Sequence, residues 1–136
     1  MKYLPLVARI CLSLIFLKAG INHAVGFAGF AGMLSQRLPL GTLLALGTVV
    51  FQLLGTLSLL LGYKVKIGAL LLIIFLIPAS LMFHNPLDPE QLNNFLKNIG
   101  LIGGLLFVID AGAGAVSVDA ALQGKTRAVS ATADQS

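Results

Sequence analysis

The amino-acid sequence predicts an all-α integral membrane protein, built as a four-helix transmembrane bundle. Of its 136 residues, 57% are apolar and 10% are charged, whereas a typical soluble domain has roughly 45–50% apolar and 25% charged residues. A soluble protein this small has too high a surface-to-volume ratio to cover so much apolar surface. The apolar residues also gather into four runs, each close to the roughly 20 residues that a helix needs to cross a bilayer.

Helices are the expected form of these runs, because lipid offers no hydrogen-bond partner to the backbone and a helix satisfies its own. The runs also lack the alternation over about ten residues that marks membrane strands. Pro78 falls inside the third run and predicts a kink there. We place the spans at residues 4–22, 42–61, 65–83 and 95–116, within a membrane domain that covers residues 1–118.

The first run follows Lys2 and so has the look of a signal peptide. Arg9 and Lys18 interrupt it, and no clear cleavage site of small residues follows. We therefore expect an uncleaved first span.

The segments between the spans have distinct roles. Residues 26–41 are too short and too rich in glycine to cross, but their apolar side chains share one helical face, which predicts a short amphipathic helix at the outer interface. Between the third and fourth spans, Pro86 and Pro89 end one helix, and Asp88 is the expected N-cap region of the next. Residues 119–136 show no apolar periodicity and are expected to form a disordered cytoplasmic tail.

The basic residues of the loops predict that both termini are cytoplasmic, because lysine and arginine favour that side of a membrane. With this orientation the outer side holds only Arg37 and Lys97. The cytoplasmic side holds Lys2, Lys64, Lys66, Lys125 and Arg127.

A charged residue inside a membrane span costs roughly 2.5–3.5 kcal/mol on insertion scales, so each one needs a partner or a route to the interface. Arg9 and Asp110 fall at similar depth near the cytoplasmic ends of the first and fourth spans. We predict an ion pair between them. The alternative is that Arg9 extends to the lipid phosphates.

Gln52 falls near the middle of the second span. An amide has no partner in lipid, so this side chain is expected to face the interior of the bundle. Gly55 on the same stripe, and the pair Gly100 and Gly104 in the fourth span, predict close helix packing.

Polar side chains also converge in depth at the predicted outer ends of three spans. They suit a carbonyl or an anionic group, although polar helix ends in contact with water are the plainer interpretation. Two histidines without a third ligand at usable spacing do not predict a metal site. The candidate ligand-binding cluster is Lys18, His23, His84, Lys97 and Asn98, and Asn22 and Asn94 share helical faces with its members.

Several classes of function are not expected. The net charge of +4 is scattered between apolar runs, without the basic stripe of a nucleic-acid-binding protein. The single cysteine, Cys11, allows no intramolecular disulfide. The sequence has no signature of a haem, flavin or iron–sulfur site, so no intrinsic cofactor is expected.

Five features together resemble the DoxX family of small four-span bacterial membrane proteins. They are Arg9 in the first span, AGINH at residues 19–23, QLLGTLSLLLGYKVKIGALLL at 52–72, MFHNP at 82–86 and KNIGLIGGLLF at 97–107. The resemblance implies a multi-pass protein of the bacterial inner membrane. It also implies a link to quinone-dependent oxidoreductase subunits and a likeness to eukaryotic cargo-receptor membrane proteins.

The sequence departs from the family at two positions. Relatives often carry a glutamate where Gln52 stands, and often a lysine near His23. Because an amide does not titrate, a proton-relay role does not transfer to Gln52, whereas a hydrogen-bonding role does.

These observations favour a redox-associated subunit with a lipid or quinone site between its helices. It would not be catalytic alone, since any electrons must come from a protein partner. The alternative is a structural or scaffold subunit of a membrane complex. In either case we expect the chain to bind a protein partner or to form a homo-oligomer. Transport of a small solute is a weaker third hypothesis, because Pro78 is the one break in the spans and transporters usually pair such breaks.

Overall fold

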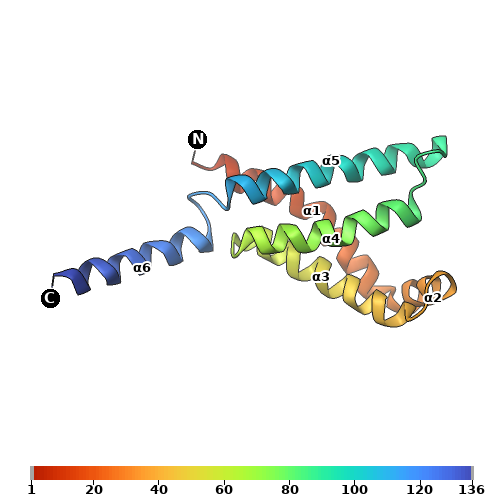
Figure 1. Ribbon diagram of the computed structural model, residues 1–136, viewed down its shortest axis with the longest axis horizontal. Helices are drawn as coiled ribbons and strands as arrows, with labels where there is room; N and C mark the ends of the chain where they lie inside the picture. The colour runs from red at the N-terminus through yellow and green to blue at the C-terminus, as the bar shows by residue number, and fades with distance from the viewer. Residues whose placement is uncertain (1, 136) are drawn as a thin grey trace.

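The computed structural model describes residues 2–135, which form helices joined by short connections and contain no strand (Figure 1). Four of the helices are long and apolar enough to cross a membrane. This confirms the all-α fold with four spans. The helices are α1 (Leu4–Val25), α2 (Phe27–Arg37), α3 (Gly41–Leu61), α4 (Val65–Phe83), α5 (Pro89–Ala111) and α6 (Val118–Asp134), and the four candidate spans are α1, α3, α4 and α5.

The fourth span lies earlier in the chain than residues 95–116. Pro89 occupies the first turn of α5, and the Asp88 side chain accepts a hydrogen bond from Glu90 N at 3.0 Å. This cap adds a polar first turn, PEQLNN, that hydropathy alone assigned to the loop. The helix ends at Ala111, where Gly112 turns the chain with a φ of 81°.

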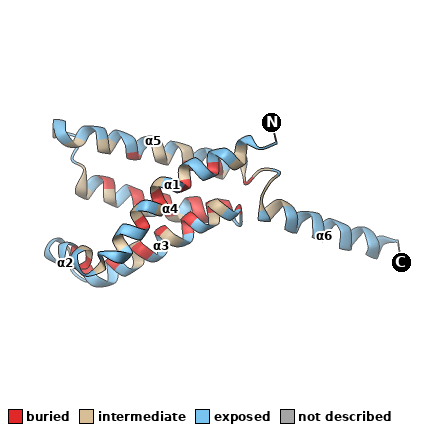
Figure 2. Ribbon diagram, turned by 180° about the vertical axis from the view of Figure 1, so that it is seen from behind, coloured by how far each residue is buried: buried red, intermediate tan, exposed pale blue. Residues whose placement is uncertain are grey.

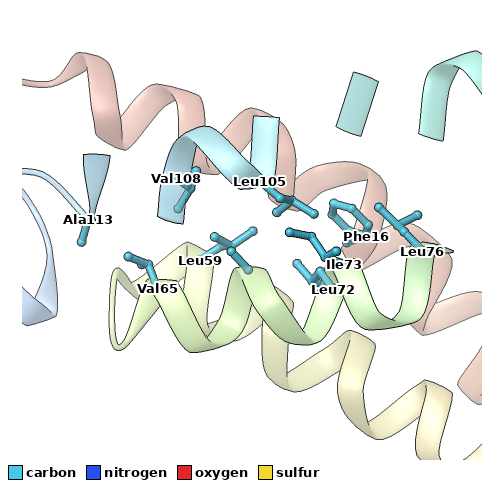
Figure 3. Packing of buried hydrophobic residues seen from close by; sticks show 10 residues of the cluster. Phe16, Leu59, Val65, Leu72, Ile73, Leu76, Leu105, Val108 and Ala113 are labelled. Carbon is cyan, nitrogen blue, oxygen red and sulfur yellow. The ribbon is translucent and has the colours of Figure 1, made fainter. Parts of the chain in front are cut away.

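The main core lies where α1, α3, α4 and α5 meet, and Figure 3 shows its side chains pointing toward one another. Leu59 of α3, Leu72 of α4 and Leu105 of α5 are all fully buried. The hairpin of α3 and α4 is tight because Gly55 has no side chain. A Cβ there would lie 2.7 Å from Leu72 Cγ and 2.9 Å from the Gly68 carbonyl oxygen.

Gly100 and Gly104, the predicted small-residue pair of α5, have different neighbours. A Cβ on Gly104 would lie 3.1 Å from a Leu12 methyl carbon of α1, whereas Gly100 faces open space. Of these two glycines, Gly104 is therefore the one that serves helix packing among residues 2–135. Much of α5 stays exposed in Figure 2, in contrast to the buried faces of α3 and α4.

The predicted ion pair between Arg9 and Asp110 is not formed. Arg9 is 1% exposed, and its guanidinium donates from Nη1 to the Leu59 carbonyl at 2.8 Å and from Nη2 to the Val116 carbonyl at 2.5 Å. The last carbonyls of α3 have no partner within their own helix and form the negative end of its dipole. They therefore neutralise Arg9 in part, and Asp110 stays exposed.

The predicted amphipathic helix is present as α2, which packs on the first half of α3 through the buried Ala31 and Leu34. The chain enters α3 through Leu40, whose φ of 58° is left-handed. At the next position a Cβ would collide with the backbone of Leu34 and Ser35. Gly41 therefore permits the tight reversal that lays α2 against α3.

The tail is a helix, α6, where the sequence predicts disorder. The Ser117 hydroxyl caps its start by accepting from Ala120 N at 3.1 Å, and Asp119 Oδ1 accepts from Lys64 N at 2.9 Å. The helix is rich in alanine. Alanine has a high intrinsic helix propensity, so this segment can be helical without burying an apolar face. None of its residues is buried, and it projects away from the bundle (Figure 1).

Candidate functional site

A cavity of about 610 Å³ lies between α1, α2, α3, α4 and α5. It extends from residues at the α2 end of the bundle, such as Leu38 and Lys97, to Gln52 halfway along α3. Its walls are mainly aliphatic and aromatic. Leu43, Leu44 and Ile74 line it and are also exposed, so the cavity is open to the surroundings of the bundle.

The deepest polar group of this cavity is Gln52, which is 0% exposed. Its Oε1 lies 3.0 Å from Nδ1 of His23, so a protonated Nδ1 donates to the amide oxygen. Its Nε2 is buried and has no hydrogen-bond partner among residues 2–135. The cavity therefore contains a buried amide with unused donors.

Gly20 brings these two polar side chains together. A Cβ at this position would lie 2.8 Å from Leu53 Cδ2 and 3.5 Å from Gln52 Cγ. The missing side chain lets α1 approach α3 closely, and His23 follows about one turn later on α1. The AGINH stretch thus sets the distance between the histidine and the amide.

His23 is fixed by its aromatic neighbours as well. Its ring stacks on Phe30 of α2, with centroids 4.2 Å apart and an interplanar angle of 12°. It also meets the Phe75 ring of α4 edge-on at 6.5 Å. These contacts hold the imidazole plane while its Nδ1 faces Gln52.

Asn98 and Ser80 form a buried polar pair between α5 and α4. Asn98 Nδ2 donates to Ser80 Oγ at 3.0 Å, and that hydroxyl donates to the Leu76 carbonyl at 2.7 Å. Asn98 also lines the cavity. Part of its hydrogen-bonding capacity therefore serves helix packing.

The other predicted residues divide between the cavity and the surface. His84 lines the cavity and pairs through Nδ1 with Gln91 Oε1 at 3.0 Å, and Lys97 lines it as an exposed side chain. Lys18 is exposed and is not part of the cavity wall. The structure thus gathers His23, His84, Lys97 and Asn98 around one cavity together with Gln52; their role in binding stays a prediction.

Side chains of α2 also contribute to this cavity, which the sequence did not predict. Phe30 holds His23, and Arg37 fastens the end of α2 to α4. Arg37 donates from Nη1 to the Met82 carbonyl at 3.3 Å, and its guanidinium carbon lies 5.5 Å from the centre of the Phe83 ring. The available signal was the amphipathic face of residues 26–41, which predicted the helix and not its contact with α4.

No group of three metal-ligating side chains occurs within the described range, residues 2–135. Gln52, His23 and the polar residues at the α2 end offer hydrogen bonds to a molecule in the cavity. The apolar walls supply contacts to a hydrocarbon chain.

Comparisons with known proteins agree with this architecture. A family model described as DoxX matches residues 4–85. The chain is 33% identical to the inner membrane protein YqjF of Escherichia coli over 128 residues, which cover 88% of this chain and 92% of that protein. It is 31% identical to the inner membrane protein YphA of Escherichia coli over 124 residues, which cover 85% and 88%.

A more distant similarity reaches a eukaryotic protein. The chain is 36% identical over 78 residues to the ER-derived vesicles protein ERV29 of Saccharomyces cerevisiae, covering 53% of this chain and 25% of that protein. No solved structure matches the chain.

Proposed function

We propose a function from the premise that this chain belongs to the DoxX family and is a multi-pass protein of the bacterial inner membrane. It is an accessory subunit that binds one lipid or quinone molecule between its helices. As part of a redox-associated complex, it would hold that molecule where a protein partner can exchange electrons with it.

The observation that carries the proposal is the cavity that α1, α2, α3, α4 and α5 enclose. Its volume of about 610 Å³ lies within the roughly 300–1,000 Å³ of typical small-molecule sites. Aliphatic and aromatic walls suit a hydrocarbon chain, and a few polar groups suit a head group. Because exposed residues of candidate spans line the cavity, molecules dissolved in the bilayer have the readiest access.

The quinone assignment has separate support. A quinone needs an apolar slot with hydrogen-bond donors for its carbonyl groups, and this cavity is lined both by the buried amide of Gln52 and by His84, Lys97 and Asn98. The family resemblance adds the link to quinone-dependent oxidoreductases. The chain's own contribution is to bind and orient the molecule, since its sequence carries no signature of an electron-carrying group.

The test is to purify the protein from its native membrane in a mild detergent and to identify retained small molecules by mass spectrometry. We expect a quinone or a specific lipid at a stoichiometric level. Filling the cavity with Ala79→Trp should lower retention by about tenfold, because Ala79 lines the wall. Ala24→Trp, at an exposed position of α1 outside the wall, is the matched control.

Two outcomes contradict the proposal. The purified protein could retain no lipid or quinone above the level of bulk detergent. Equal retention by Ala79→Trp and the parent protein would also place the bound molecule outside this cavity.

The scaffold function is the second candidate, and α6 is the observation that favours it. A helix of 17 residues without a buried side chain projects from the bundle, which leaves its surface available to a protein. If this candidate is right, a stoichiometric protein partner should co-purify without quinone. Removal of residues 118–136 should then release that partner, whereas Ala79→Trp should not.

A further inference from the structure

We infer that Gln52 and His23 form a head-group site at the middle of the membrane. The bound molecule enters the cavity head first and accepts a hydrogen bond from Gln52 Nε2 through an uncharged carbonyl oxygen. The ligand class is therefore a long apolar chain that ends in a ketone, quinone or ester. This inference rests on the proposed function and adds the depth, orientation and head-group chemistry of the ligand.

The first observation is that the side-chain amide nitrogen of Gln52 has no hydrogen-bond partner among residues 2–135. Gln52 is 0% exposed, lines the cavity and has no hydrogen-bond partner at Nε2 among residues 2–135. Buried donors in proteins are almost always paired, so an unpaired one in a cavity wall indicates a missing acceptor. A carbonyl oxygen of a bound molecule is such an acceptor.

The second observation is that the amide oxygen of Gln52 already pairs with His23. His23 Nδ1 lies 3.0 Å from Gln52 Oε1, which leaves the donating end of the amide for the ligand. The stacked Phe30 ring fixes the imidazole, so His23 is a positioning residue for Gln52. The pair therefore offers N–H groups, which recognise acceptors.

The third observation is the separation of this pair from the basic residues at the α2 end. Gln52 lies eleven positions after Gly41, the first residue of α3, which is roughly 16 Å along the helix axis. Lys97 lines the cavity, and Arg37 contacts the Met82 carbonyl, at the end where α2 lies. An anionic head group would be held at that end, whereas a neutral carbonyl alone gains from the deep site, where a charge is costly.

The experiment uses the full chain in detergent with two matched probes, a long-chain methyl ketone labelled with ¹³C at its carbonyl and the alkane of equal length. Binding is measured by competition, and the ketone C=O stretch by isotope-edited infrared spectroscopy. We expect the parent protein to bind the ketone about tenfold more tightly than the alkane. The C=O stretch of the bound ketone should fall below its value in empty micelles.

The variants identify the donor. Gln52→Leu, or Gln52→Met if the branched side chain packs poorly, should bring the two affinities together and return the C=O stretch to its micelle value. His23→Phe keeps an aromatic ring on Phe30 and should reduce the ketone preference while the alkane affinity holds. Gln36→Leu, at an exposed position of α2, should change neither quantity.

The outcomes separate this inference from the proposed function. Failure of both probes to bind overturns the proposed function and the inference together. Equal binding of both probes, sensitive to Ala79→Trp, keeps the cavity as a lipid site and overturns the head-group assignment. A ketone preference that survives Gln52→Leu and Gln52→Met also overturns it.

Discussion

At the scale of single residues, Arg9 joins the first span to the end of α3 and to the segment after α5. Arg9→Met should destabilise the protein by about 2–4 kcal/mol, because the carbonyls of Leu59 and Val116 lose their donor inside the bundle. Arg9→Lys should recover only part of that loss. The guanidinium reaches the two carbonyls with two separate nitrogens, whereas lysine has a single ammonium nitrogen. Equilibrium unfolding in mixed micelles measures the differences.

Asp110→Asn is the control for this comparison. The structure leaves Asp110 exposed, so the variant should unfold with unchanged free energy. A loss as large as that of Arg9→Met would restore the ion pair between these two residues and contradict the carbonyl contacts.

The pair of Gln52 and His23 makes a separate prediction for the empty protein. Gln52→Leu alone leaves the His23 ring nitrogen without its partner and should destabilise by about 1–3 kcal/mol. Adding His23→Phe removes the second polar group and should restore most of the stability. A double-mutant cycle on ligand-free protein measures this coupling, and simple additivity of the two losses would contradict it.

Residue types and depths allowed part of the site to be predicted from the sequence. His23, His84, Lys97 and Asn98 line one cavity, as their common depth suggested. Lys18 does not, because depth says nothing about which side of a helix faces inward. The partner of Arg9 was also missed, since backbone carbonyls at a helix end carry no mark in the sequence.

At the scale of elements, α2 forms one end of the cavity wall. It is held against α3 by the turn before α3, which requires a glycine at position 41. Gly41→Ala should displace α2 from α3, because the new methyl group would meet the backbone of Leu34 and Ser35. Retention of the cavity ligand should fall, and hydrogen exchange in residues 27–37 should accelerate. Gly29→Ala, which faces open space on the same helix, should leave both unchanged.

The tail helix makes an independent prediction. Asp119→Ala removes the hydrogen bond to Lys64 N, so amide exchange in the first turns of α6 should accelerate while the bundle keeps its protection. Asp134→Ala, at the far end, is the matched control. Protection of residues 118–134 at the level of an unfolded chain in the parent protein would contradict a helical tail.

Elements with a strong apolar pattern were predicted well, and those that depend on caps were not. The spans α3 and α4 agree with the sequence to within a residue at each end. The predicted start of α5 was six residues too late. The first residues of the helix are polar and are stabilised by the Asp88 cap, so hydropathy does not reveal them. The helix α6 was missed because it has no buried face, so its form depends on alanine propensity and the Ser117 cap.

At the scale of the whole molecule, the distribution of basic residues predicts that both ends of the chain are cytoplasmic. In a Cys11→Ser background, the variant Gln36→Cys in α2 should react with a membrane-impermeant maleimide that is added to intact spheroplasts. A single cysteine at Ser130 in α6 should react only after the membrane is opened. The reverse pattern of labelling would invert the topology.

The contacts of Arg9 also bear on the order in which the chain is made. Its second acceptor, Val116, lies 107 residues downstream. During synthesis the first span therefore enters the bilayer before either acceptor exists, the Leu59 carbonyl follows with α3, and the Val116 carbonyl follows when nearly the whole chain has emerged. A chain that stops before residue 116 therefore keeps Arg9 Nη2 without this acceptor.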